Sequence, residues 1–277
     1  MKIIENSETF TQTVNSSKSE KKHCATNMLI MQDKVNDLIE GRKLYYDLID
    51  GVLWLFVKHE DYYVAYFYLP KGEKLKMVPQ DLDVIVELIG NQTRYNSEWE
   101  TGLLETGFEK YNKYFEFVTK KEEYQDFIEK QAEKMYSFVE RMGCCCRSAK
   151  KEDYNAMYQL RRAKIDKYEV YTLTDKEIEE METHNRSILV LNKENEIIAT
   201  CCYSRMGNTA LGMYGVSLQK GFGAVVSPLV MAFAFREGCD RLIAWIWENN
   251  TDSLDLKRWF GVKTGKFRQK FLLRKAN

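Results

Sequence analysis

The segment of this chain whose residue types could do chemistry is glycine-rich and reads Tyr214-Gly-Val-Ser-Leu-Gln-Lys-Gly-Phe-Gly-Ala224. Backbone N–H groups at the start of a helix have no partner inside the helix, and with the helix dipole they suit a phosphate or pyrophosphate. Gly221 and Gly223 let the backbone approach such a ligand because neither carries a Cβ. The turn is therefore a candidate site for a phosphate or pyrophosphate.

Two well-known phosphate-binding patterns do not fit this segment. The P-loop pattern GxxxxGK[ST] is absent from the sequence. The dinucleotide fingerprint lacks its third glycine, and a meander of strands precedes the turn in place of a first strand–helix unit. A Gly-x-Gly pair also occurs in tight turns that serve packing alone, so a purely structural turn is the alternative.

Periodic apolar residues predict the elements that position this turn. In the second half, strands are expected at 143–148, 187–191, 197–205, 210–217, 242–247 and 267–274. Helices are expected at 153–164, 175–183, 222–237 and 251–259, with Asp153, Thr174 and Asn250 as their N-cap candidates. In the first half we expect helices at 27–39 and 97–106, strands at 52–57, 62–69 and 113–118, an apolar run at 84–89, and a mobile arm or loosely attached strand at 1–22.

This element order and this turn resemble the GNAT (Gcn5-related N-acetyltransferase) family, from about Glu140 to Asn277. The family's pyrophosphate loop, [Q/R]-x-x-G-x-[G/A], matches Leu218-Gln-Lys-Gly-Phe-Gly223 except at its first position, and Gln219 lies one residue along. A second signature, an Asn opening the next helix with Gly-Phe eleven residues later, fits Asn250 and Gly261-Val262 with Val in place of Phe.

The resemblance implies an α/β (α+β) fold, a GNAT-like mixed central sheet flanked by helices, with acetyl-CoA or another acyl-CoA as co-substrate. A backbone N–H near Val216 or Ser217 would donate to the thioester carbonyl. The amides of Gly221, Phe222, Gly223 and Ala224 would hold the pyrophosphate. Lys257 stands where the family often has a Tyr that acts as general acid for the leaving thiolate. Glu248 is the first candidate for the general base, followed by Tyr203, Tyr214 and His184. The implied cofactor-binding residues are Val216, Ser217, Leu218, Gln219, Gly221, Phe222, Gly223, Ala224 and Asn250.

The first half repeats one signature, since Asn96 precedes Gly107-Phe108 by eleven residues. We therefore expect an internal duplication, a tandem GNAT arrangement. The first copy has no glycine-rich turn between its hairpin and Val84, so we expect it to be degenerate and to bind no CoA. The expected segments are a first domain at 1–119, a connecting helix at 120–142 and an acyl-CoA-binding domain at 143–277.

Composition limits the possible partners. Lys and Arg number 41, as do Asp and Glu, so the net charge is zero and gives no general attraction to nucleic acid or anionic membrane. No apolar stretch is long enough to span a bilayer and the N-terminus is too polar for a signal peptide, so we expect a cytoplasmic protein. Without a CxxC pair, and with His23, His59 and His184 in unrelated contexts, the seven cysteines predict reduced thiols and no metal site.

Three functions are compatible with these patterns. The first is an N-acyltransferase that moves an acetyl or longer acyl group from acyl-CoA to an amine on a small molecule or peptide. The second is a related aminoacyl-tRNA-dependent transferase, favoured only by the basic residues Arg258, Lys263, Lys266, Arg268 and Lys270. The third is a non-catalytic acyl-CoA-binding sensor, favoured by Lys257 and Leu218. The acceptor and the oligomeric state cannot be read from the sequence.

Overall fold

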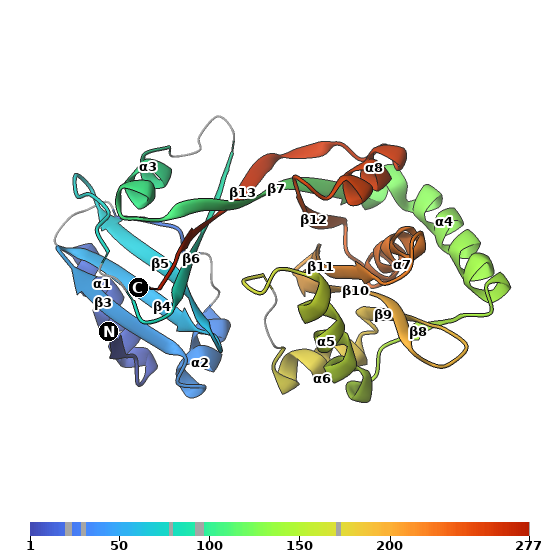
Figure 1. The fold of residues 1–277 in the computed structure, drawn as a ribbon, viewed down its shortest axis with the longest axis horizontal. Helices are drawn as coiled ribbons and strands as arrows, with labels where there is room; N and C mark the ends of the chain where they lie inside the picture. Colours follow the sequence, from blue (N-terminus) through green and yellow to red (C-terminus); the bar gives the residue numbers. More distant parts are fainter. Residues whose placement is uncertain (20–23, 29–31, 78–79, 92–96, 170–172, 277) are drawn as a thin grey trace. The chain divides into compact units, whose positions relative to one another are not determined.

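The computed structural model describes residues 1–19, 24–28, 32–77, 80–91, 97–169 and 173–276 (Figure 1). They form two compact units. The first unit combines Met1–Tyr114 with Lys266–Asn277, and the second is Phe115–Gly265. The last strand of the chain therefore belongs to the first unit, whereas the sequence placed it in a domain at 143–277.

The second unit is built on a mixed sheet. Its order is β7-β12-β11-β10-β9-β8, and β7 enters the unit at Phe115. Neighbouring strands from β8 to β11 are antiparallel, and β12 runs parallel to β11. The strands are β7 (Glu109–Lys120), β8 (Cys145–Ser148), β9 (Ser187–Leu191), β10 (Ile197–Met206), β11 (Thr209–Ser217) and β12 (Arg241–Trp247).

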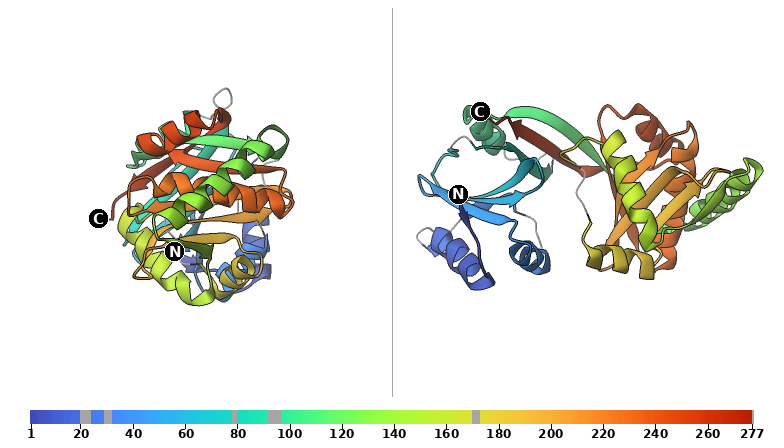
Figure 2. Two further views of the ribbon diagram at one scale, coloured as in Figure 1. Left: turned by 90° about the vertical axis from the view of Figure 1, so that its right-hand side faces the viewer. Right: turned by 60° about the horizontal axis from the view of Figure 1, so that its bottom comes forward.

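Helices cover both faces of this sheet, which explains why β9 is buried along its whole length. Ile188 and Val190 point into the core under α4 and α7, whereas Leu189 points into the core under α5 and α6. Figure 2 shows the yellow-green α5 in front of the orange strands in its right-hand view. The helices are α4 (Lys121–Arg141), α5 (Tyr154–Lys164), α6 (Asp175–Thr183), α7 (Phe222–Arg236) and α8 (Thr251–Trp259), with a 3₁₀ turn at Lys151–Asp153.

The first unit has a sheet of the same type. Its order is β1-β3-β4-β5-β6-β13, and β2 pairs with β5. The strands are β1 (Lys2–Ile3), β2 (Cys24–Thr26), β3 (Leu44–Ile49), β4 (Val52–Lys58), β5 (Tyr62–Pro70), β6 (Asp83–Asn91) and β13 (Thr264–Arg274). The described helices are α1 (Ser7–Ser19), α2 (Gln32–Glu40) and α3 (Ser97–Glu105).

Both faces of this sheet are also covered, and the apolar run of β4 follows from that. Leu53 and Leu55 pack with α1 and α2, and Trp54 and Phe56 pack on the side of α3. In a strand that is buried on both faces, side chains on either face are apolar, so the sequence shows a continuous apolar run and no alternation of apolar and polar residues.

The two units repeat one topology. In each, three antiparallel strands lead to a fourth strand that is parallel to the third, followed by a helix and a long last strand. The last strands are exchanged, because β13 pairs with β6 in the first unit and β7 lies beside β12 in the second. The duplication expected from the sequence is therefore present in the fold, although Asn96, on which it was based, lies outside the described residues.

Three expectations differ from the structure. In the described part of the segment 1–22, β1 pairs with β3 as the alternative of an attached strand expected, whereas α1 buries Phe10 and Val14 against the sheet, so a mobile arm is wrong. The helix expected to connect two domains is α4, which packs on α7 inside the second unit. Asp153 does not cap α5, because its carboxylate accepts from the Lys150 amide and from the Arg147 guanidinium. Among the described residues, no helix combines the length and apolar character needed to cross a membrane.

Candidate active site

A gap opens between the two parallel strands of the second unit. Pairing of β11 with β12 ends at Gly212 and Ala244, although β11 continues to Ser217 and β12 to Trp247. The opposite edge of β11 stays paired with β10 as far as Ala199 and Ser217. The strands therefore separate beyond Gly212, and the β12-facing edge of β11 is open to a ligand.

A bulge in β11 lies where the strands separate. Tyr214 and Gly215 stand opposite the single residue Cys201, because Met213 pairs with Cys202 and Val216 pairs with Thr200. Tyr214 has a φ of 49°, a left-handed conformation that is strained for an aromatic residue. Such an inserted residue bends β11, and we attribute its separation from β12 to this bend.

The glycine turn follows β11 directly. Gly221 is the N-cap of α7 with a φ of 93°, which an L-residue adopts only with strain. The Phe222 amide donates to the Gln219 carbonyl at 3.3 Å and the Ala224 amide to the Gly221 carbonyl at 3.1 Å. Within the described chain, the amides of Gly221 and Gly223 have no protein acceptor.

Open space lies in front of this turn. A Cβ at Gly221 would meet no heavy atom within 4 Å, and one at Gly223 would meet only the Ser217 Cβ, at 4.0 Å. Phe222 is buried in the core and packs on Phe138, so the turn is anchored from behind. The turn thus fits an oxyanion ligand with two free amides, half of the four that the sequence predicted.

A buried cation lies on the same face as α7. Lys257 of α8 is 5% exposed, and the only described polar partner of its Nζ is the Met231 Sδ, at 3.9 Å. Burial lowers the pKa of Lys257 to about 8. Burial also raises the pKa of the neighbouring Cys201 to about 12, so that thiol stays neutral and does not compensate the ammonium.

Comparison with known proteins identifies solved structures with a similar fold. No family model and no curated protein matches the chain. A GCN5-related N-acetyltransferase-like protein from Streptococcus suis has 10% identity and a TM-score of 0.52, over 96% of this chain and 99% of that one. A tandem GNAT protein from the clavulanic acid biosynthesis pathway has 9% identity and a TM-score of 0.52, over 85% of this chain and 84% of that one. A GCN5-related N-acetyltransferase from Sphaerobacter thermophilus has 10% identity and a TM-score of 0.52, over 81% of this chain and 76% of that one.

The chain has a tandem GNAT fold. At this level of identity the likeness concerns the fold, and the chemistry has to be argued from the site. In the second GNAT unit, the open edge of β11 and the glycine turn are consecutive along the chain, and their role as a ligand site stays a prediction. Glu248 is half-buried in the turn after β12, and the Asn250 side chain caps α8 by accepting from the Ser253 amide at 3.1 Å. Their contacts with a ligand stay predictions.

Two base candidates have structural roles instead. Tyr203 is fully buried and its hydroxyl donates to Glu237 at 2.8 Å, at the C-terminal end of α7. His184 ends α6 and lies 4.0 Å from the same carboxylate. Burial and the Glu237 carboxylate raise the pKa of Tyr203, so it is a poor proton acceptor near neutral pH.

Sequence reasoning missed Arg161, which is buried under the β11 bulge. Its Cζ atom lies 4.9 Å from the centre of the Tyr214 ring. The signal was present, because the buried residues of α5 are Tyr154, Met157 and Arg161, at helical spacing. An arginine at the third position of this buried stripe interrupts its apolar pattern, and a charged side chain at a core position indicates a candidate functional residue.

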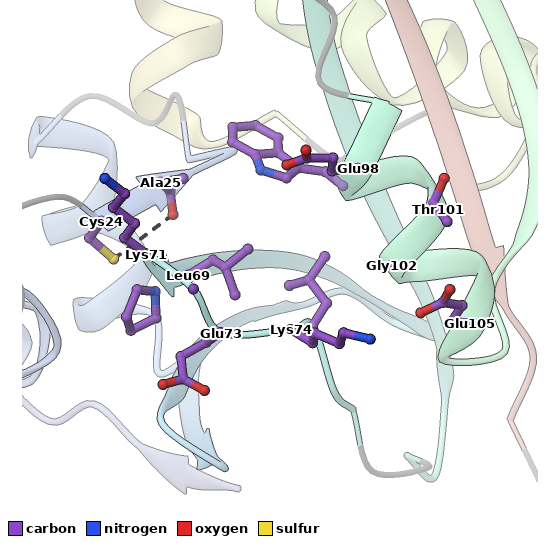
Figure 3. Close-up of a pocket in the computed structure, with 14 residues that line it drawn as sticks. Cys24, Ala25, Leu69, Lys71, Glu73, Lys74, Glu98, Thr101, Gly102 and Glu105 are labelled. Atoms are coloured by element: carbon purple, nitrogen blue, oxygen red, sulfur yellow. Dashed lines mark hydrogen bonds between the residues drawn. The ribbon is translucent and has the colours of Figure 1, made fainter.

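The first GNAT unit has the same strand gap, but β2 fills it. Pairing of β5 with β6 ends at Ala65 and Val86, and β2 then pairs with the end of β5, Cys24 opposite Pro70. Beside it lies a cavity of about 680 Å³ between the end of β5 and α3 (Figure 3). Its charged lining has both signs: Lys71, Glu73, Lys74, Glu98 and Glu105. The carboxylates among these residues would repel a diphosphate, and the absence of CoA binding in this unit stays a prediction.

Proposed function

We propose that the second GNAT unit binds an acyl-CoA and transfers its acyl group to an amine. The observation that carries the proposal is the open edge of β11 next to the unpaired amides of Gly221 and Gly223. The diphosphate of CoA would accept from those amides at the positive end of the α7 dipole. The pantetheine arm would then lie along the gap and bring the thioester to the bulge.

Backbone donors would stabilise the reaction's negative charge. As the amine nitrogen bonds to the carbonyl carbon, charge builds on the carbonyl oxygen, and an N–H near Val216 or Ser217 would donate to it. A fixed donor of this kind contributes roughly 2.7–4 kcal/mol to the transition state. Collapse of the intermediate breaks the C–S bond and releases the CoA thiolate.

Two side chains would handle the protons. Glu248 would take the proton that the amine loses. Lys257 would give a proton to the thiolate in place of the tyrosine common in the family. Its pKa of about 8 is close to the ordinary thiol value of about 8.5, and such a match favours proton transfer.

Two of the five basic residues that favoured tRNA are paired within the protein. Arg258 pairs with Asp255 at 2.7 Å, and Lys270 pairs with Glu100 at 2.6 Å. An aminoacyl-tRNA-dependent transferase is therefore the weaker candidate. An acyl-CoA sensor without turnover remains the second candidate, because Lys257 replaces the usual acid.

Thermal shift with CoA, acetyl-CoA and longer acyl-CoAs tests the proposal. A ligand at 100 times its Kd stabilises the folded protein by about 2.7 kcal/mol. Gly223→Trp should abolish the shift because the indole would fill the space before the turn. Met206→Trp, at an exposed hairpin tip of the same unit, is the matched control and should keep the shift.

The outcomes separate the candidates. Binding with release of CoA thiol in the presence of amines supports the acyltransferase. Binding without turnover across an amine panel favours the sensor. The absence of a shift with any of these compounds would overturn the proposed CoA site.

A further inference from the structure

Helix α5 buries a cation that has no counter-ion among the described residues. Arg161 is 2% exposed, and its Nη2 donates only to the Cys202 Sγ, at 3.2 Å. Its Nε is fully buried and has no hydrogen-bond partner. No carboxylate in the described chain lies within ion-pair distance of Arg161. A buried guanidinium is normally paired, because burial removes it from water.

Other arginines of this unit show what pairing looks like here. Arg186, the residue before β9, has Glu180 and Glu237 at 2.6 Å each. Arg147 has Asp153 at 2.6 Å, with both carboxylate oxygens engaged. Arg161 therefore differs from these two arginines, because its described hydrogen-bond partner is a thiol sulfur and not a carboxylate.

A second unpaired polar atom lies on the same face of the sheet. The Thr200 Oγ1 is fully buried and has no hydrogen-bond partner in the part of the chain that the structure describes. Thr200 and Cys202 are two residues apart on β10, opposite Leu189 and Ser187, so their side chains share the α5 face. Thr200 also pairs with Val216, and the Arg161 guanidinium covers the ring of Tyr214. Both unpaired groups thus adjoin the segment of β11 that borders the gap.

The α5 face is opposite the one covered by α7. A CoA whose diphosphate is held at the start of α7 would leave the α5 side of the gap for the other substrate. A planar guanidinium with unused donors matches a carboxylate in shape and charge. We propose that Arg161 binds the carboxylate of the acyl acceptor, which makes the acceptor an amino acid or a similar small amine that carries a carboxylate.

This inference rests on the proposed acyltransferase, and the wild-type chain can test it without any variant. The twenty standard amino acids and their carboxamides are offered with acetyl-CoA, and thiol release and acylated product are measured. We expect a carboxylate acceptor to exceed its own amide in kcat/KM by about 100-fold or more, since the amide would leave the guanidinium buried and unpaired. Equal use of acid and amide, or use only of amines without a carboxylate, would overturn the inference.

Variants test whether the preference for a carboxylate-bearing acceptor depends on Arg161. Arg161→Met should raise the KM for the amino acid and remove the preference over the amide, with the Kd for acetyl-CoA unchanged. Arg161→Lys should restore part of the preference because the charge returns. Lys164→Met, an exposed cation of the same helix, is the control and should behave as wild type. An equal loss with acid and amide in Arg161→Met would assign Arg161 a structural role.

A separate measurement keeps this inference apart from the proposed function. If no acyl-CoA stabilises the protein, the proposed acyltransferase function is wrong. Thermal shift with amino acids alone then tests whether Arg161 binds a carboxylate. A shift that amino acids cause, amides do not cause and Arg161→Met abolishes would still assign a carboxylate site. The absence of any such shift in the wild type would overturn it.

Discussion

The Asn27 Oδ1 accepts a hydrogen bond from the Phe67 amide at 2.8 Å, across the strand gap of the first GNAT unit. Its Nδ2 donates to the Glu87 carbonyl at 3.0 Å and to the Ala65 carbonyl at 3.4 Å. One side chain thus joins β5 and β6 just beyond the point where their pairing ends. In the second unit the equivalent edge is open, so the two copies of one topology differ at the place where a ligand would enter.

Replacing Asn27 with Ala should destabilise the first unit. Three backbone groups, two of them in buried hydrogen bonds, would lose the Asn27 side chain as a partner, and we expect a loss of about 3 kcal/mol in the free energy of unfolding. Hydrogen exchange at Phe67, together with urea unfolding, measures it. Glu40→Ala, at an exposed position of α2, should change stability by less than about 0.5 kcal/mol. Unaltered protection at Phe67 in Asn27→Ala would show that β2 alone closes the gap.

Much of the second unit could be predicted because its signals are local. Helices 175–183 and 251–259 and the strand 187–191 have the predicted bounds, and Thr174 caps α6 through the Glu177 amide. The exchange of β7 and β13 could not be predicted, because either last strand satisfies the same apolar pattern. The Asn27 bridge joins residues 40 apart in sequence, and no local pattern signals such a contact.

Lys257→Met should stabilise the protein while impairing catalysis. In the unfolded chain the lysine titrates near 10.5, and in the folded one burial lowers its pKa to about 8. Below pH 8 Lys257 is protonated in both the folded and the unfolded state, so burial of its ammonium lowers the free energy of unfolding by about 3 kcal/mol. Lys257→Met would remove this cost. Between about pH 8 and 10.5 Lys257 is mostly neutral in the folded state and still protonated in the unfolded state, so the free energy of unfolding of the wild type should rise with pH.

Urea unfolding at pH 7, 9 and 10.5 checks this, and the rise should be missing in Lys257→Met. Turnover should fall by about 100-fold or more if the ammonium protonates the thiolate. Lys263→Met, at an exposed position, should change neither quantity. A wild-type stability that is flat over this pH range would contradict the buried ammonium.

Tyr203→Phe should cost stability and leave catalysis intact. Burial alone would raise the pKa of Glu237, but hydrogen bonds from Arg186 and Tyr203 outweigh it and lower the pKa. That carboxylate therefore contributes stability that is present above pH 4.5 and is lost as pH falls through its lower folded pKa. Removing the hydroxyl should cost about 1.5–3 kcal/mol, the range for a hydrogen bond to a charged group. A fall in kcat at unchanged stability would return Tyr203 to the list of base candidates.

Gly221→Val should weaken acyl-CoA binding through the backbone of the turn. The φ of 93° at Gly221 is strained for valine and costs about 1–2 kcal/mol, although a Cβ there would meet no neighbour within 4 Å. The matched control is Gly207→Val, since Gly207 has a φ of 57° in an equally open hairpin turn of the same unit. Both variants should lose similar stability in urea, and only Gly221→Val should raise the Kd for acetyl-CoA, because only that turn presents amides to the diphosphate. Equal Kd values for the two variants would mean that the ligand is held elsewhere.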